Sequence, residues 1–203
     1  MLEELKARFG AENITVFKQV SENLEILHVQ LEQNNNPISV LLTHGLSNYK
    51  MPVHERYQGR EYNELFFCIP RYWDLKEIDN PNLNWPVLWL EKLVNHVVEK
   101  NLWYGPGHSI QCYSDYKSLS ETMKQNHLML IDPILLKEEM SPLVCESKTI
   151  YFLAGMPIFG EEMDYKQGKG TYKLLTKFLN NNYNEKLDDY RESVLTSRMK
   201  FWR

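Results

Sequence analysis

The stretch ELFFCIP, residues Glu64–Pro70, decides which class of fold this chain adopts. The residues from Leu65 to Ile69 are all apolar, so they lack the alternation of a strand that has one face in water. An unbroken run of this length indicates a β-strand that is buried on both faces. Pro70 ends the strand, because proline has no N–H for a sheet hydrogen bond. The chain is therefore expected to bury this strand between layers of other elements.

Ahead of this strand, the sequence predicts a short helix and then three strands. Leu2, Leu5 and Phe9 recur at the spacing of one helix face. The segments NITVFK, LEILHVQLE and ISVLLT are rich in β-branched and apolar residues, and the turn sequence QNNNP separates the last two. This order predicts a helix followed by a β-meander.

After Pro70, the sequence predicts both helices and strands. Asn84 is a good N-cap and Pro86 fits a first helical turn, so a helix is expected from Trp85 to about Lys100. HLMLID and TIYFLAGMPIF have the composition of strands, and helical patterns follow in EEMDYKQ, TYKLLTKFLNN and LDDYRESVLTSRMKFW. The last pattern belongs to a predicted C-terminal helix over residues 183–203.

These elements mix without strict alternation, which favours an α+β fold over a doubly wound parallel one. We predict a single domain over residues 1–203, built on a mixed, mostly antiparallel β-sheet that is flanked by helices. The 203 residues suffice for one sizeable domain, and 43% of them are apolar, so a substantial core can form.

The net charge and the cysteine content limit which cellular compartment and which classes of partner are expected. The formal net charge of −4 argues against a free-standing nucleic-acid binder, which needs a basic surface, and is compatible with a basic protein partner. Cys68, Cys112 and Cys145 are far apart and odd in number, as expected of free thiols in a reducing cytosol. The sequence contains no recognisable signal peptide and no apolar run long enough to span a bilayer. We therefore expect a cytoplasmic protein.

The glycine-rich stretch around Lys169 raises the question of a phosphate site. A P-loop needs a glycine, four further residues and then Gly-Lys-Ser/Thr. Counted back from Gly168, the first position is Met163, and Gly170 stands where the Mg²⁺-binding hydroxyl should be. No Gly-x-Gly-x-x-Gly sequence occurs either. The glycines are therefore interpreted as the end of one helix and the start of the next, and no cofactor is predicted.

The histidines and cysteines do not form a known metal or catalytic motif. The sequence has no His-Glu-x-x-His, no Cys-x-x-Cys and no Gly-x-Ser-x-Gly. His44, His54 and His108 are expected in loops and could converge in space. His108 and Cys112 leave one enzyme hypothesis open, which requires both side chains within hydrogen-bond reach in a cleft. Apart from that hypothesis, no catalytic or metal-binding residue is predicted.

Three acidic residues, Glu161, Glu162 and Asp164, follow a predicted strand and open a predicted helix. Carboxylates at such a place are stabilised by the helix dipole and by unpaired backbone N–H groups. The functional alternative is an acidic rim that meets lysine and arginine residues of a partner.

Taken in order, the motifs resemble the suppressor-of-fused family domain. The resemblance extends from about Ile38 to Leu179, and these segments carry it: HGLSNYKMPVHE, YNELFFCIP, NWPVLWLEKL, LWYGPGHSI, LMLIDP and IYFLAGMPIFGEEMDYKQGKGTYKLL. It implies an α+β domain whose mixed sheet is flanked by helices. In the animal branch of that family, this domain and a second, C-terminal domain together hold a transcription factor in Hedgehog signalling. That role is not expected for a chain that ends soon after the shared region.

The bacterial branch of the family consists of stand-alone domains, many of them thought to be antitoxins or immunity proteins that oppose nuclease toxins. The resemblance thus implies an antitoxin that neutralises a toxin, encoded by a neighbouring gene, through stoichiometric protein–protein binding, without direct nucleic-acid or membrane partners. The candidate partner-binding residues are His54, Glu55, Trp103, Tyr104, His108, Glu161, Glu162 and Asp164. The alternative is a peptide-binding adaptor, which needs an unpaired edge strand beside an apolar groove.

Overall fold

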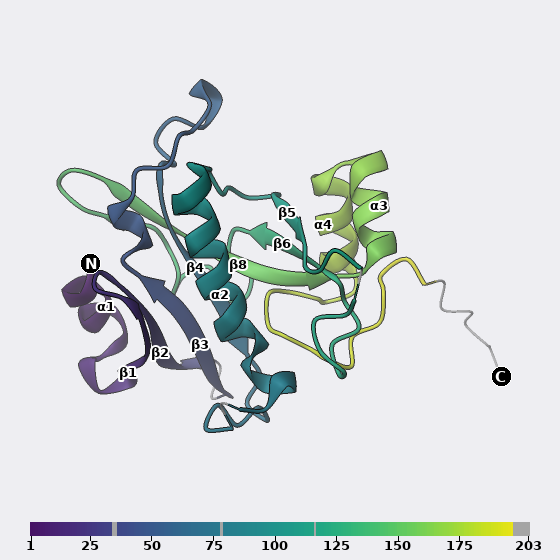
Figure 1. Cartoon of the computed structure of the whole chain (residues 1–203), viewed down its shortest axis with the longest axis horizontal. Helices are drawn as coiled ribbons and strands as arrows, with labels where there is room; N and C mark the ends of the chain where they lie inside the picture. The colour runs from purple at the N-terminus through teal and green to yellow at the C-terminus, as the bar shows by residue number, and fades with distance from the viewer. Residues whose placement is uncertain (34–35, 78, 116, 197–203) are drawn as a thin grey trace.

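The computed structural model describes residues 1–33, 36–77, 79–115 and 117–196 (Figure 1). Its α-helices are α1 (Leu2–Phe9), α2 (Pro81–Lys100), α3 (Gly160–Lys169) and α4 (Thr171–Asn180), and short 3-10 helices are η1 (Ala11–Asn13), η2 (Leu46–Asn48) and η3 (Glu55–Tyr57). The strands are β1 (Ile14–Ser21), β2 (Leu24–Gln33), β3 (Asn36–His44), β4 (Tyr62–Ile69), β5 (Ser109–Gln111), β6 (His127–Ile131), β7 (Leu143–Val144) and β8 (Thr149–Ile158). The predicted opening, one helix and then a β-meander, is confirmed.

Within the described residues, the sheet has the strand order β1-β2-β3-β4-β8-β6-β5, and β7 pairs with β8 beside this path. β4 and β8 are parallel, whereas the other neighbouring pairs are antiparallel. A parallel pair needs a long crossover, and the chain from α2 to β7 supplies it. The predicted α+β fold, a mixed and mostly antiparallel sheet flanked by helices, is confirmed.

β4 is the central strand of this order, and it is buried on both faces as its sequence predicts. Leu65, Phe67 and Ile69 belong to the core layer that includes α2, whereas Phe66 and Cys68 belong to the layer that includes α1 and α4. All five side chains have at most 1% of their surface exposed. Burying each of the larger side chains contributes roughly 1.5–3 kcal/mol, so β4 holds the two layers together.

Helices cover both faces of the sheet. α2 crosses one face, as Figure 1 shows, and buries Trp85 and Leu93 against it. On the other face, Leu5 of α1 and Phe178 of α4 are fully buried. In the described residues, no helix is both long enough and apolar enough to cross a lipid bilayer.

α2 begins at Pro81 rather than at the predicted Trp85. Asn80 is the N-cap, and its side-chain oxygen accepts a hydrogen bond from the backbone N–H of Asn82 at 3.0 Å. Pro86 lies inside the helix and not in its first turn. Asn80-Pro81 and Asn84-Trp85-Pro86 both carry a start signal, and the structure uses the earlier one.

The predicted C-terminal helix over residues 183–203 is wrong for its described part, residues 183–196, which form turns and one isolated bridge. We call residues 184–196 the strap. Its Glu185 is fully buried and accepts hydrogen bonds from the backbone N–H groups of residues 134–136 at 2.8–3.1 Å. The N–H of Leu187 donates to the carbonyl of Cys68 at 2.9 Å. These tertiary contacts hold the segment in a non-helical course, so they override the local helical pattern. Residues 197–203 lie outside the described part of the chain.

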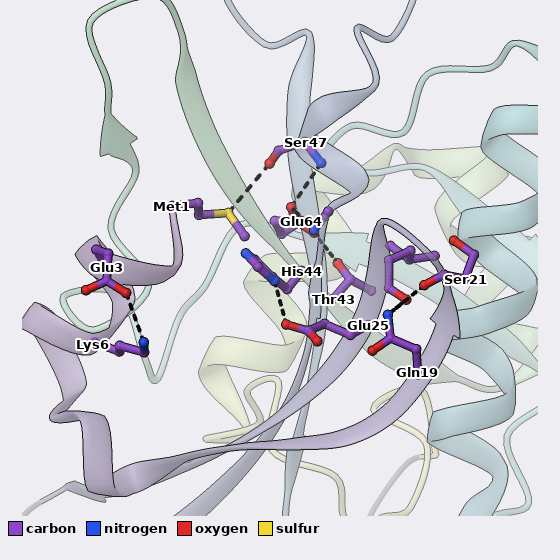
Figure 2. A network of polar contacts seen from close by, with 12 residues as sticks. Met1, Glu3, Lys6, Gln19, Ser21, Glu25, Thr43, His44, Ser47 and Glu64 are labelled. Carbon is purple, nitrogen blue, oxygen red and sulfur yellow. Dashed lines mark hydrogen bonds and ion pairs between the residues drawn. The ribbon is translucent and has the colours of Figure 1, made fainter.

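A second buried glutamate shapes the loop that follows β3 (Figure 2). Glu64, on β4, accepts hydrogen bonds from the Thr43 hydroxyl at 2.6 Å and from the backbone N–H groups of Gly45 and Ser47 at 3.1 and 2.9 Å. Burial raises the pKa of Glu64, against the hydrogen bonds from Thr43, Ser47 and Gly45, which lower it. The carboxyl therefore replaces the solvent that would otherwise satisfy the backbone of η2.

Candidate functional site

β5 ends the sheet, and no described strand pairs with its outer side. Its pairing with β6 is regular, with Ile110 opposite Leu128. The hydrogen bonds from Leu130 N to His108 O at 2.8 Å and from Cys112 N to Asn126 O at 2.9 Å fix the alternation of the ladder. Because hydrogen-bonded and non-hydrogen-bonded residues alternate in antiparallel pairs, the backbone groups of Ser109 and Gln111 point to the open side. The edge therefore offers unpaired donors and acceptors.

A groove of about 520 Å³ runs between this edge strand and α2. Trp89, Leu93, Tyr104 and Ile110 supply apolar surface, while polar side chains such as Lys92, His96 and Gln111 stand around them. Leu88 also lines the groove, and 53% of its surface is exposed. An apolar floor with a polar rim is the usual composition of a protein-binding site.

The lining of the groove is held in place by α2 and its neighbours. Trp89 packs edge-on against Tyr113 at a centroid distance of 5.8 Å, and the Lys92 ammonium lies 4.3 Å from the Trp89 ring centre. At the other end, His96 Nδ1 and the Tyr104 hydroxyl are 3.0 Å apart. Burial raises the pKa of Tyr104 to about 12, so its hydroxyl stays protonated and can donate at neutral pH.

The opposite face of β5 is polar. Lys166 of α3 donates a hydrogen bond from Nζ to the Ser109 hydroxyl at 2.5 Å. Burial lowers the pKa of Lys166, and burial together with the nearby Lys166 charge lowers the pKa of His108, against its hydrogen bond with Trp103. The edge thus separates an apolar face on α2 from a cationic and polar face on α3.

An aromatic cluster lies at the start of β5. The Trp103 ring is 4.5 Å from the Tyr57 ring and 4.8 Å from the His108 ring, centre to centre. Its indole N–H donates to the carbonyl of Arg60 at 3.1 Å. Gly105 is required beside it, because a Cβ at that position would stand 2.2 Å from the Trp103 ring. All three residues are half-buried, so part of the cluster is accessible to a partner.

The structure brings some of the predicted partner-binding residues together. Trp103 and His108 are in contact, and Tyr57 joins them to η3, the short helix that contains Glu55 and is capped by His54. His54 and Glu55 are exposed at the surface. Tyr104 is buried instead, with 4% of its surface exposed, and it forms part of the lining of the groove.

The predicted acidic rim is wrong for Glu162. This side chain is fully buried and forms a two-pronged ion pair with Arg191 of the strap, with N–O distances of 2.7 and 2.8 Å. Its carboxylate also accepts the backbone N–H of Phe159 at 3.0 Å, which caps α3. Glu162 therefore fastens the strap to α3 and cannot touch a partner. Glu161 and Asp164 are exposed on the same helix, where contact with a partner remains a prediction.

The hypothesis of a catalytic His108–Cys112 pair is wrong. The two residues lie at opposite ends of β5, four residues apart in an extended chain, which separates their backbones by roughly 13 Å. Cys112 has 1% of its surface exposed, and burial raises the pKa of its thiol to about 12, against the Lys92 charge, which lowers it. The thiol is therefore protonated at neutral pH and shielded from a substrate.

The other sequence motifs have structural roles. Gly170 has φ +94° between α3 and α4, so it is the helix end that the sequence analysis predicts in place of a phosphate loop. His44, at the end of β3, pairs with Glu25 at 2.8 Å, whereas His54 caps η3 and His108 packs against Trp103. The described residues contain no group of three or more His, Cys, Asp or Glu side chains that could hold a metal ion.

Sequence reasoning missed the groove and the strap anchor. Leu88 was visible as an apolar residue among the polar ones of α2, but its exposure depends on how that helix rotates over the sheet. Tyr57 lies two residues from Glu55, and this proximity could have marked it as a further candidate for partner binding. No sequence signal marked the role of Arg191, because its partner Glu162 is distant in sequence and contacts it only in the folded chain.

Comparison with known proteins identifies the family. The family model described as "Suppressor of fused protein (SUFU)" matches residues 21–192, which is most of the chain. The chain belongs to this family. The matched range is longer than the residues 38–179 on which the sequence motifs lie. No curated protein sequence matches the chain.

Two solved structures share the SUFU fold of this chain. A crystal structure of the Sufu-Fu complex superposes with a TM-score of 0.66 at 16% identity, over 95% of this chain and 88% of the other. A crystal structure of Drosophila Suppressor of Fused superposes with a TM-score of 0.60 at 17% identity, over 85% of this chain. The match spans 43% of the Drosophila protein, so it corresponds to less than half of that molecule.

Proposed function

We propose that this SUFU-family chain is a protein-binding module that holds an extended segment of a partner along the open edge of β5. The observation that carries the proposal is the outward-facing backbone of Ser109 and Gln111 beside the apolar groove on α2. An added strand would satisfy these backbone groups, and its alternate side chains would enter the groove. Main-chain pairing supplies affinity in such complexes, and the groove supplies specificity.

The side chains around β5 suit this role. Leu88, Trp89 and Ile110 offer an apolar anchor site, and aromatic anchors within a polar rim carry most of the energy of protein interfaces. The half-buried rings of Tyr57 and Trp103 pack on each other, and Trp103 also contacts His108, the residue before β5. Sufu itself has been crystallised with Fu, a protein partner, which supports binding as the general activity of the fold without identifying the partner of this chain.

A more specific form of the proposal is an antitoxin or immunity protein, in bacterial cytoplasm, whose partner is a toxin encoded by a neighbouring gene. The net charge of −4 and the exposed Glu161 and Asp164 on α3 support a basic partner, and a nuclease toxin has a basic surface because it binds phosphates. In this form the chain acts by covering the toxin and carries out no reaction of its own.

The test uses a proline that removes only the outward N–H of the edge. The chain is co-expressed and co-purified with the product of the neighbouring gene, and the dissociation constant is then measured by calorimetry. Gln111→Pro deletes a donor that makes no bond to β6, so folding should persist. Gln111→Ala is the control, because it shortens the same side chain and keeps the N–H.

We expect wild type and Gln111→Ala to bind with similar affinity and Gln111→Pro to bind at least tenfold more weakly. Equal affinity of both variants would show that the partner does not pair with β5. Failure of the wild-type chain to bind the neighbouring product would reject the antitoxin form. The edge-strand proposal would then be tested with the same two variants against a partner isolated by cross-linking.

A further inference from the structure

A second surface, remote in sequence from the β5 groove, gathers two cations around a cavity of about 400 Å³. Arg71, which follows β4, and Lys186, on the strap, both line this cavity and are exposed. The remaining lining comes from the start of β3, from Ile69 and from Leu135, and it includes no carboxylate.

The backbone forces both cations to the surface. The turn from Pro70 to Trp73, closed by a hydrogen bond of 3.1 Å, buries Trp73 in the core and leaves Arg71 and Tyr72 outside. Lys186 forms a bridge to Cys68 of β4, and its neighbours Glu185 and Leu187 are both buried. The cations are thus carried on segments that the core holds in place.

Neither cation is neutralised within the described residues. Within the part of the chain that the structure describes, the Arg71 guanidinium and the Lys186 ammonium form no ion pair and no hydrogen bond. Glu185, next to Lys186, points inward and binds backbone N–H groups, and Asp189 accepts the hydroxyl of Tyr72. Two like charges that share a concave site repel each other, and an anion between them relieves that repulsion.

Two exposed tyrosines lie close to the cations along the chain: Tyr72 directly follows Arg71, and Tyr190 lies four residues after Lys186 on the strap. Tyr72 and Tyr190 have 57% and 82% of their surface exposed, and their ring centres are 6.3 Å apart. Tyrosine and arginine are the residue types enriched in the energetic centres of protein interfaces. Guanidinium groups bind carboxylates with two parallel hydrogen bonds, which makes Arg71 a selective contact for acidic side chains.

We propose that Arg71, Lys186, Tyr72 and Tyr190 form a second docking surface, which binds an acidic segment of a protein partner. Carboxylates of that segment enter the cavity between the two cations, and its backbone or apolar atoms lie on the tyrosine rings. The surface shares no residue with the β5 groove, so it can be occupied together with it.

The test is a titration of the full ¹⁵N-labelled chain with hexaglutamate, followed by NMR. We expect saturable shifts of the amide signals of residues 71–72 and 186–190, and no such shifts with hexalysine. The double variant Arg71→Glu, Lys186→Glu should bind hexaglutamate at least tenfold more weakly. The control Lys50→Glu, Lys169→Glu reverses the same charge at two exposed lysines that do not line this cavity and should change affinity less than twofold.

Three results would overturn the proposal: shifts that spread over all exposed lysines, an equal loss in both double variants, or a thymidine hexanucleotide that binds the same residues as tightly as hexaglutamate. The last would assign the surface to nucleic acid. If the double variant does not fold, Tyr190→Ser replaces it, because this side chain is almost fully exposed and its removal leaves the core intact. It should weaken binding by about threefold, and unchanged affinity would count against the docking surface.

Discussion

The two edges of the sheet meet solvent in opposite ways. β1, at one end, has register shifts between Val16 and Lys18 and between Gln19 and Ser21, which are β-bulges or similar irregularities. Lys18 forms an ion pair with Glu91 of α2 at 2.6 Å. Bulges and edge lysines prevent unwanted pairing with other strands. β5, at the other end, has regular pairing and no charged residue of its own.

This difference indicates which edge is free to bind. An edge that is irregular and charged resists strand addition, whereas a regular one beside an apolar groove favours it. β5 relies instead on its neighbours: α2 supplies the groove, and Lys166 of α3 covers Ser109. The following experiments test that contrast, beginning with the contact that holds α3 beside β5.

The largest effect is expected from Arg191→Ala. This change leaves the Glu162 carboxylate buried without its partner, which costs about 3–5 kcal/mol of unfolding free energy. Urea denaturation measures the loss. Arg60→Ala, which breaks the exposed pair with Asp132, should cost less than about 1 kcal/mol. Equal losses would mean that the strap does not hold α3.

At the open edge, Leu88→Gln should weaken partner binding about tenfold, which corresponds to about 1.4 kcal/mol. Leu88 lines the groove and is exposed, and glutamine keeps the helix propensity, so stability should change by less than about 0.5 kcal/mol. Val98→Gln on the same helix, outside the groove, serves as the control. Calorimetry with the co-purified partner measures the dissociation constant of each variant. A similar loss of affinity in both variants would exclude the groove as the contact surface.

At the protected edge, Lys18→Val should make the chain associate with itself as concentration rises, because it removes the charge that blocks β1. The half-buried pair with Glu91 contributes at most about 1 kcal/mol, so the fold should survive. Light scattering gives the molar mass. Lys173→Val, on the exposed side of α4, removes the same charge and should stay monodisperse to the same extent as wild type.

The smallest change in stability at neutral pH is expected from Glu64→Gln, on β4 between the two edges. Because burial raises the folded-state pKa of Glu64, its contribution to stability is fully present below the ordinary value of 4.5 and is lost as pH rises through the raised pKa. Glu64→Gln keeps the shape and an acceptor oxygen, so its unfolding free energy should fall less with rising pH than that of wild type. Urea denaturation at several pH values gives the unfolding free energy of both proteins. If it changes with pH by the same slope in wild type and in Glu64→Gln, Glu64 stays ionised.

Much of this fold could be predicted from the sequence, because most of its strands and the helices α1 to α4 have a local pattern of apolar residues. The apolar run from Leu65 to Ile69 indicated the central strand, and the fold class followed from the mixture of elements. The candidate site was predicted only in part. Trp103 and His108 are in contact as expected, but Glu162 and Tyr104 are buried. No local sequence pattern distinguishes a surface carboxylate from a buried one that pairs with an arginine distant in the chain.

The sequence by itself determined the family, the order of most strands and the existence of α1, α2, α3 and α4, since these depend on residues close together in the chain. Only the tertiary structure decided that β5 ends the sheet, that α2 leaves a groove beside it, and that residues 184–196 run as a strap instead of a helix. The physical reason is that burial is a property of contacts between distant segments. Glu185 and Arg191 gain more from satisfying buried partners than their segment gains from helical hydrogen bonds exposed to water.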